Sequence, residues 1–233
     1  MLRLPILPRA PVIPFPPVDQ ALTEPNGLLC AGGDLSEPRL LLAYRHGIFP
    51  WFSEGEPILW WSPDPRAVFE LASCHPNSRS ARYLRRSGWT ARVNFDFEAV
   101  IDACAAPRDY ASGTWITSAM RAAYLRLHQS GHAHCLGTYA GDELVGGIYG
   151  IAIGRVFFGE SMFSRRPNAS MHAFYALAGR LREAGFELLD GQVESAHLMR
   201  LGAHTISRSD FVARLESLCT SPPHDAQWHR QPD

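Results

Sequence analysis

The chain of 233 residues contains no lysine: all 22 of its basic residues are arginine. This absence excludes catalysis through a lysine Schiff base or a lysine nucleophile. Every basic contact must instead come from a planar, fork-shaped donor that pairs well with carboxylates and phosphates. The net charge is only -1, so any binding of a nucleic acid must depend on a local basic surface.

Metal-binding and disulfide motifs are missing as well. The five cysteines are scattered and none forms a C-x-x-C pair, so neither a zinc knuckle nor a dithiol motif is predicted. His132, His134 and Cys135 lie close together, but they are typical of the start of a strand. No apolar run approaches a membrane span, and the proline-rich beginning does not resemble a signal peptide. We expect a reduced, cytosolic protein that binds no metal and no membrane.

Nucleotide-binding and nucleophile motifs are incomplete. No Walker sequence is present, and GGIYG at 146–150 lacks the G-x-G-x-x-G spacing of a dinucleotide-binding turn. Residues 159–163, GESMF, resemble a nucleophile elbow without its final glycine, which leaves Ser161 a weak candidate nucleophile. The chemistry is therefore expected from other polar groups.

Proline and aromatic residues characterise the first part of the chain. Residues 1–19 are rich in proline and predict an extended arm that lies on the body of the protein. Residues 40–46 predict a short helix closed by Gly47. The segment 48–63 contains three Trp and two Phe, which suit a compact aromatic core and a ligand pocket equally well.

A domain boundary is predicted where Pro63 and Pro65 bracket Asp64. We therefore expect a small N-terminal domain at 1–64 and a larger domain at 65–219. The remaining residues, 220–233, are polar and proline-rich and predict a disordered tail.

The larger domain mixes strands and helices. Strands are predicted at 134–139, 144–151 and 155–160, joined by glycine-containing turns, and a helix at 168–184 leads to another strand at 186–193. A strand–helix–strand step places its last strand parallel to a neighbour. The predicted fold is α+β, with a central, mostly antiparallel sheet.

Two acidic residues stand in apolar strand sequence. Glu160 ends the run Val-Phe-Phe, and Asp190 lies within the strand predicted at 186–193. A buried carboxylate is costly unless something pairs with it. Because strand side chains alternate, Asp190 and Gln192 point to the same face. These polar residues predict a shared cleft.

A basic surface is predicted on the helix at 77–87. Spacings of three and four residues place its arginines on one face, and no acid lies in this stretch: Arg79, Arg82, Arg85 and Arg86. An ordinary solvated face mixes charges of both signs, whereas clustered arginines suit phosphate. Together, the polar cleft, the aromatic segment and the arginine face suit an enzyme that transfers an apolar group from a phosphate-bearing carrier.

Seven stretches together carry a resemblance to a known family. They are EPNGLL at 24–29, GGDLS at 32–36, YRHGIFPWFS at 44–53, EPILWWSPDPRAV at 56–68, GTWIT at 113–117, LVGGIYG at 144–150 and GRVFFGESMFSR at 154–165. The chain resembles the leucyl/phenylalanyl-tRNA–protein transferases from about residue 15 to 212. Several of these stretches are long and specific, so chance similarity is not credible.

The resemblance implies an enzyme that moves Leu, Phe or Met from aminoacyl-tRNA to proteins with N-terminal Arg or Lys. This transfer marks the acceptor for degradation in the bacterial cytoplasm. The resemblance also implies a small N-terminal domain followed by a domain similar to the GNAT acyltransferases. No cofactor and no metal are implied, and a monomer is expected.

The family's functional residues fall on positions of this chain by motif. The apolar pocket for the transferred side chain falls on Trp51, Trp115 and Phe157, the catalytic groups on Asp190 and Gln192 with Glu160 nearby, and the basic tRNA cluster on Arg79, Arg82, Arg85 and Arg86. Simple alternation, however, puts Phe158 and not Phe157 on the Glu160 face, unless Gly159 permits a bulge. The family usually has Cys where this chain has Gly191, which predicts a looser strand.

The resemblance leaves the proton acceptor open. Asp190 is expected to orient Gln192, whose carbonyl oxygen aligns the attacking amine, and Asp190 or a water could take the proton. Glu160 could bind the donor's amino group or the acceptor's positive side chain.

Two alternatives compete with this interpretation. An acyl-CoA-dependent N-acetyltransferase needs a glycine-rich pyrophosphate loop, but the matching turn at 164–169 contains no glycine. A non-catalytic tRNA-binding adaptor would keep the arginine face but would leave Glu160, Asp190 and Gln192 without a joint role.

Overall fold

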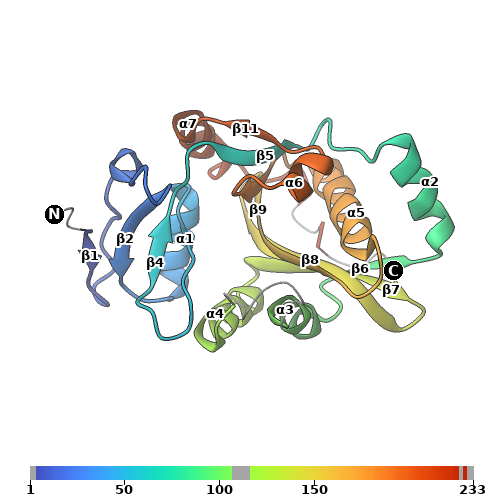
Figure 1. Cartoon of the computed structure of the whole chain (residues 1–233), viewed down its shortest axis with the longest axis horizontal. Helices are drawn as coiled ribbons and strands as arrows, with labels where there is room; N and C mark the ends of the chain where they lie inside the picture. The colour runs from blue at the N-terminus through green and yellow to red at the C-terminus, as the bar shows by residue number, and fades with distance from the viewer. Residues whose placement is uncertain (1–3, 107–115, 226–227, 230–233) are drawn as a thin grey trace.

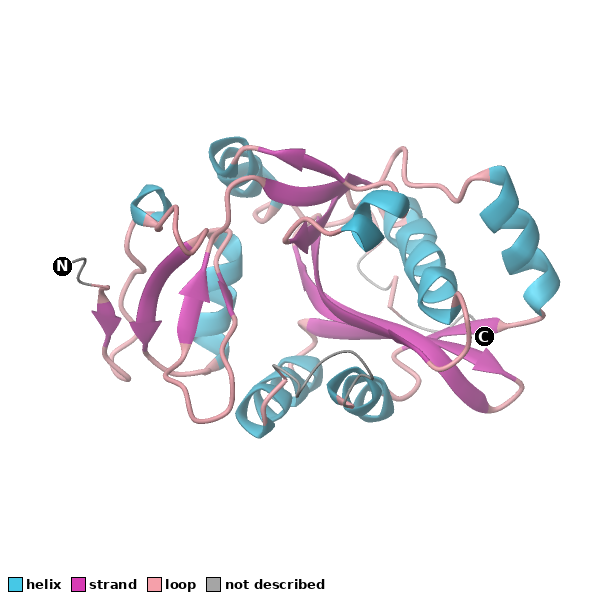
Figure 2. Cartoon of the chain, in the orientation of Figure 1, coloured by secondary structure: helices cyan, strands magenta, loops and turns pink. Residues whose placement is uncertain are grey.

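Two β-sheets of unequal size organise the chain (Figures 1 and 2). The computed structural model describes residues 4–106, 116–225 and 228–229. The smaller sheet has the strand order β1 (Ile6–Leu7), β2 (Leu28–Gly32), β4 (Leu59–Trp61) and β3 (Phe49–Pro50). Helix α1 (Glu37–Arg45) packs beside it, and a short 3-10 helix spans Val18–Gln20. The proline-rich arm joins this sheet through β1, which pairs in parallel with β2.

The larger sheet carries the predicted meander. Its strand order is β11 (His204–Ile206), β5 (Arg66–Glu70), β10 (Leu188–Gln192), β9 (Val156–Ser164), β8 (Glu143–Ile153), β7 (Ala133–Ala140) and β6 (Thr90–Val93). All of these neighbours pair antiparallel except β9 and β10, which are parallel. The prediction of an α+β fold with a mostly antiparallel central sheet is confirmed.

Helices cover both faces of the larger sheet. In Figure 1, α3 (Phe97–Ala105) and α4 (Ser118–Gln129) lie below it, and α5 (Ala169–Glu183) and α6 (Ala196–Arg200) lie above it. Helix α2 (Ser78–Ser87) lies beyond α5, and α7 (Arg208–Leu218) lies beside β5 and β11. Two buried core clusters result: one joins α3 and α4 to the N-terminal domain, and the other lies under α5.

The cap residues explain where several helices begin. The side chains of Thr117 and Ser207 accept backbone N–H groups of α4 and α7, and that of Asn77 does the same for α2. Ser36 precedes α1, but its side chain makes no such bond. Instead, Oδ1 of Asp34 accepts the N–H of Ser36 at 2.8 Å.

The observed strands differ from the sequence prediction in their bounds and in their number. Strand β9 continues to Ser164 instead of ending at Glu160. The short strands β1 to β4 and β11 were not predicted, because two to five residues carry little periodic signal.

Within residues 220–233, for which the sequence predicts a disordered tail, the described part contacts the core. Trp228 is only 6% exposed and packs against Phe186, with ring centroids 5.3 Å apart. Its carbonyl oxygen accepts a hydrogen bond from Arg180, and His224 donates its N–H to Ala184. One large aromatic side chain buries enough apolar surface to hold a segment that is otherwise polar.

Replacing Trp228 by Ala should lower the free energy of unfolding by about 3 kcal/mol, because the change leaves a cavity beside Phe186. Urea denaturation measures this loss. Phe95→Ala is the matched control: Phe95 is 59% exposed, so its loss should stay within about 1 kcal/mol. Equal losses in the two variants would show that the tail does not belong to the core.

Candidate active site

The only parallel strand pair described in the larger sheet separates at its end. β9 and β10 pair from Val156 to Phe158 and from Leu188 to Asp190. Beyond this point each strand shifts its register with its other neighbour: β9 at Glu160, which has no partner on β8, and β10 between Asp190 and Gln192. The two irregularities open a space at the end of the paired strands, and polar side chains enter it from both.

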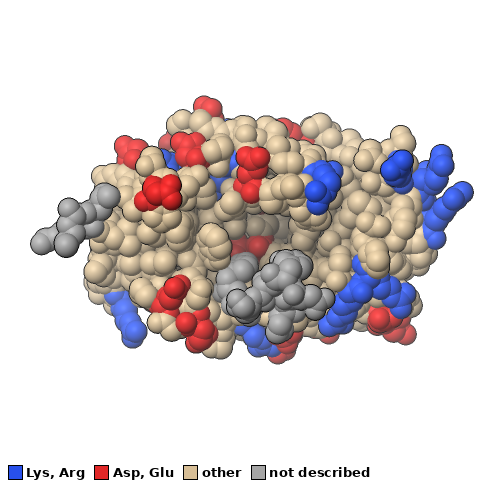
Figure 3. Space-filling model, in the orientation of Figure 1, with Lys and Arg blue, Asp and Glu red and all other residues tan. Residues whose placement is uncertain are grey.

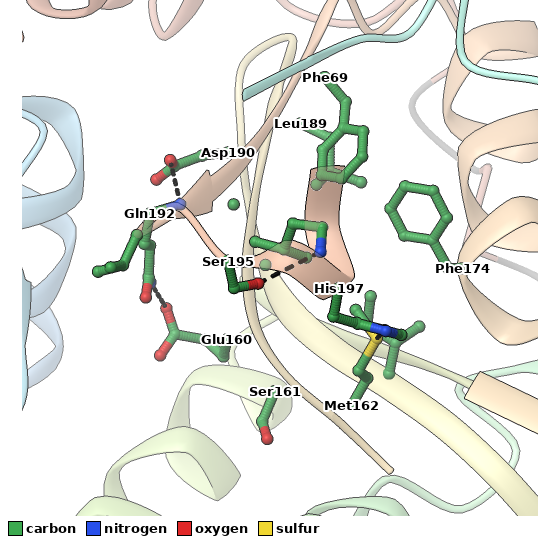
Figure 4. Close-up of a pocket in the computed structure, with 15 residues that line it drawn as sticks. Phe69, Glu160, Ser161, Met162, Phe174, Leu189, Asp190, Gln192, Ser195 and His197 are labelled. Carbon is green, nitrogen blue, oxygen red and sulfur yellow. Dashed lines mark hydrogen bonds between the residues drawn. The ribbon is translucent and has the colours of Figure 1, made fainter. Parts of the chain in front are cut away.

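A cavity of about 360 Å³ occupies this space. Figure 4 shows its two walls: Phe69, Phe174 and Leu189 lie on one side, and Glu160, Asp190 and Gln192 lie on the other. In the space-filling view, the hollow is visible near the centre of the molecule, with acidic atoms at its floor (Figure 3). The cavity can therefore hold an apolar group next to polar, proton-exchanging groups.

Glu160 lines the cavity and accepts three side-chain hydrogen bonds. It accepts hydrogen bonds from the hydroxyl groups of Tyr44 at 2.8 Å and Tyr124 at 2.6 Å, and from Nε2 of Gln192 at 2.7 Å. Burial raises the pKa of Glu160 to about 7, although these three donors oppose the rise. A carboxyl group in this range can exchange a proton at neutral pH.

Asp190 is held by an ion pair that is closed to solvent. Nε and Nη2 of Arg66 donate to its two oxygens at 2.8 Å and 2.7 Å, and both side chains are almost completely buried. Arg66 also donates to the carbonyl oxygen of Gly47 and lies over the rings of Phe49 and Phe211. The pair therefore ties β10 to the N-terminal domain and to α7.

Gln192 takes its place through its backbone and its side chain. Its φ angle is +62°, in the left-handed region that residues other than glycine rarely adopt. Its N–H donates to Oδ1 of Asp190 at 2.8 Å, which holds this conformation. A carboxylate only accepts hydrogen bonds, so the amide NH₂ group faces Glu160 and the amide oxygen is left for a substrate.

A second hollow of about 200 Å³ lies at the junction of the two domains. Its lining includes Phe49, Pro50 and Trp51 of the N-terminal domain and Glu160 and Gln192 of the larger sheet. Trp51 is 45% exposed and packs against Trp61. Because Glu160 and Gln192 line both hollows, two substrates could meet at these side chains.

Of the two described residues predicted for the apolar pocket, Trp51 lines one of the two hollows above and Phe157 lines neither. Phe157 is completely buried in the core cluster under α5 and does not line the cavity. The bulge at Glu160 does not bring it to the Glu160 face, and Phe158 packs against Tyr44 on that side. Trp51 lines the second hollow, and Trp115 lies outside the described residues.

The arginine helix lies apart from the cavity. The four arginines at 79, 82, 85 and 86 are exposed. In Figure 1, α5 lies between α2 and the strands β9 and β10, whose residues line the cavity. Figure 3 shows basic side chains gathered at the right-hand end of the molecule, over α2. None of the four has an ion-pair partner within residues 4–106, 116–225 and 228–229.

Several residues of the site escaped the sequence prediction. Arg66 carried a usable signal, since a charged residue begins the apolar strand β5 just as Glu160 interrupts β9. Tyr44 and Tyr124 carried none, because both read as ordinary apolar positions of helices. Their meeting at Glu160 joins three elements that are distant in the sequence.

Metal-ligand clusters and membrane-spanning helices are absent from the described part of the chain. It contains no group of three His, Cys, Asp or Glu side chains placed to hold a metal ion. No described helix is long and apolar enough to cross a bilayer.

Comparison with known proteins gives the family. A family model described as leucyl/phenylalanyl-tRNA protein transferase matches residues 68–216, and the model of its N-terminal domain matches residues 33–64. The chain belongs to the leucyl/phenylalanyl-tRNA–protein transferase family. Membership makes it an enzyme that transfers Leu or Phe from tRNA to protein.

Curated relatives match over most of their length. The transferase of Xanthomonas euvesicatoria is 56% identical over 213 residues, which are 90% of this chain and 85% of the relative. That of Pseudomonas entomophila is 53% identical over 216 residues, 93% of this chain and 95% of the relative.

Solved structures match at low identity. L-PGS from Bacillus licheniformis has a TM-score of 0.40 at 16% identity, and the match covers 70% of this chain and 55% of that one. A GCN5-related N-acetyltransferase from Sphaerobacter thermophilus has a TM-score of 0.37 at 18% identity, with 74% and 54% covered.

The buried ion pair of this transferase gives a stability prediction. Arg66→Met leaves Asp190 as an unpaired buried charge, which should cost about 3–5 kcal/mol of unfolding free energy. Adding Asp190→Asn removes that charge, so the double variant should recover at least half of the loss. Urea denaturation of the double-mutant cycle measures the coupling, and simple additivity of the two single losses would contradict it.

Proposed function

We propose that this transferase moves Leu, Phe or Met from aminoacyl-tRNA to the α-amino group of proteins whose first residue is Arg or Lys. The product would carry an N-terminal degradation signal, and the reaction would take place in the cytoplasm with the enzyme as a monomer. The observation that supports this most is the cavity in which an apolar wall faces Glu160 and Gln192.

The apolar wall suits the side chain of the donor amino acid. Phe69, Phe174, Leu189 and Ile148 line it, and Met162 adds a flexible side chain that can adapt to Leu or Phe. Gly159 and Gly191 contribute no side chains, which leaves room for an unbranched β-carbon. This placement moves the donor pocket away from Trp51.

The second hollow suits the first residue of the acceptor. Its wall at Trp51 offers an aromatic face to a guanidinium or ammonium group, and Glu160 in the same lining offers a carboxyl group. An acceptor placed there and a donor placed in the larger cavity would meet at Gln192, which lines both. This arrangement brings the amine and the ester carbonyl together, which is the main demand of a bimolecular transfer.

In this proposal Asp190 orients Gln192 and does not take the proton. Both of its oxygens are bound by Arg66, so protonation would break a completely buried ion pair. Its hydrogen bond to the N–H of Gln192 holds that residue in its left-handed conformation. The amide oxygen of Gln192 can then align the attacking amine.

The donor is already an activated ester, so the transfer needs no cofactor. The family match favours this reaction over acyl-CoA-dependent acetylation, and the turn at 164–169 lacks the glycines of a pyrophosphate loop. A non-catalytic adaptor would not explain why Gln192 donates hydrogen bonds to both Glu160 and Asp190 at the cavity.

Transfer of radiolabelled Leu or Phe from charged tRNA tests the proposal. A short peptide that begins with Arg should be labelled, whereas the same peptide beginning with Ala should not, because only the former places a cation in the second hollow. Labelling of both peptides would contradict the acceptor specificity. Labelling of neither, with tRNA still bound, would support an adaptor.

The arginine face of α2 gives a separate prediction. Arg82→Ala with Arg85→Ala should raise the KM for charged tRNA about three- to tenfold and weaken its salt dependence, because two phosphate contacts are lost. The turnover number should change little, since α2 lies apart from the cavity. Arg45→Ala, an exposed arginine on α1, is the control. An unchanged KM at moderate salt would rule out this face.

A further inference from the structure

Three oxygen-bearing side chains form a closed ring beside the cavity. The hydroxyl groups of Tyr44 and Tyr124 lie 2.6 Å apart, and each also lies within 2.8 Å of a different oxygen of Glu160. The three residues come from α1, α4 and β9, so both domains contribute to the ring. Every side of the ring is at hydrogen-bonding distance.

The ring holds fewer protons than contacts when Glu160 is ionised. Each tyrosine has one hydroxyl proton, and both are needed to donate to the carboxylate, which leaves the contact between the two hydroxyl groups without a proton. The tyrosines keep these protons, because burial, reinforced by the Glu160 carboxylate, raises the pKa of both well above its usual value. One additional proton on Glu160 would complete all three hydrogen bonds in a cycle.

The ring can be reached from the substrates. Glu160 lines both hollows, whereas Tyr44 and Tyr124 are completely buried behind it. Gln192 donates to Glu160 through its amide NH₂ group, so a substrate amine bound to the amide oxygen would lie next to this carboxylate. Asp190, the other acid of the cavity, is engaged by Arg66.

We propose that Glu160 is the catalytic base that takes a proton from the acceptor's α-ammonium group. Tyr44 and Tyr124 are positioning residues whose hydroxyl groups hydrogen-bond to Glu160 before and after it takes this proton. This inference rests on the proposed function, because it assumes an acceptor amine at Gln192. Glu160 then removes the proton of the amine, a step for which the amide of Gln192 is too weak a base.

Protons, electron pairs and bonds are all accounted for in the proposed step. One proton passes from the ammonium nitrogen to a carboxylate oxygen of Glu160, and the freed electron pair of the nitrogen attacks the ester carbonyl carbon. The carbon–nitrogen bond forms, the bond to the ribose oxygen breaks, and that oxygen takes a second proton from the attacking nitrogen. The amide keeps one hydrogen, and Glu160 releases its proton to solvent after the products leave.

The electrostatic surroundings agree with this role. The groups that face Glu160 are Tyr44 on α1, Tyr124 on α4, Tyr149 on β8, and Asp190 and Gln192 on β10. Burial raises the pKa of Glu160 to about 7, and a free α-amine has a pKa of about 8, so the proton transfer is nearly balanced. Because the base must be ionised, activity should fall as the pH falls through about 7.

Glu160→Gln tests the base directly, because the amide keeps the shape of the side chain but cannot take the proton. At about pH 7 its kcat should be on the order of a hundredfold lower than that of the wild type. At about pH 9.5 the acceptor amine is free without help, so the difference should shrink to about fivefold. The KM for charged tRNA should stay within about twofold, and the melting temperature verifies the fold.

The tyrosines provide a second, independent test with a matched control. Tyr44→Phe and Tyr124→Phe each open the ring and should lower kcat at about pH 7 on the order of tenfold, with a smaller loss at about pH 9.5. Tyr149→Phe should leave kcat unchanged at every pH, because the Tyr149 hydroxyl is buried near Glu160 but has no hydrogen-bond partner within the described ranges.

The outcomes separate this inference from the proposed function. A loss of kcat in Glu160→Gln that is the same at every pH would contradict the role of Glu160 as a base and leave only a structural role. Full activity in that variant would also contradict its role as a base. Equal kcat values in Tyr44→Phe and Tyr149→Phe at each pH would contradict the proposed role of the ring. A wild-type enzyme that labels no Arg peptide would overturn the proposed function and this inference together, whereas wild-type labelling with normal Glu160→Gln kinetics would overturn the inference alone.

Discussion

The ion pair between Arg66 and Asp190 is the interaction on which the geometry of the site depends. Both charges are almost completely buried, so each would be costly without the other. The two parallel hydrogen bonds fix the direction of the Asp190 carboxylate, and that carboxylate holds the backbone of Gln192. Because Arg66 is also bound by the carbonyl of Gly47 and lies over Phe49, the end of β10 and the N-terminal domain are positioned together.

The same junction explains why a small domain accompanies the larger one. Tyr44 reaches from α1 to Glu160, and Trp51 forms a wall of the second hollow. The larger cavity is lined by residues of the larger sheet, its helices and its loops, whereas the second hollow also has Phe49, Pro50 and Trp51 in its lining. Glu160 and Gln192 line both. A two-substrate reaction needs two binding surfaces that converge on one set of polar groups, and the domain junction supplies them.

Sequence patterns predicted the larger domain better than the smaller one. The meander of β7, β8 and β9 and the parallel step to β10 follow from long apolar runs separated by glycine turns, which are local signals. The strands β1 and β3 have two residues each and exist only because distant segments pair with them. Trp228 shows the same limit: its polar neighbours predict disorder, but the core it enters is formed by residues far away in the chain.

The sequence by itself determined the α+β order and the family. It also pointed to the polar residues, because an acid in an apolar strand is costly to bury unless other groups pair with it. The exposed arginine face of α2 also follows from helical spacing alone. Only the tertiary structure decided that Phe157 lies in the core, since the cluster around it is formed by residues that are distant in the sequence, such as Phe69 and Phe174. It alone joined Tyr44, Tyr124 and Glu160, because hydrogen bonds between three distant elements leave no periodic trace in the sequence.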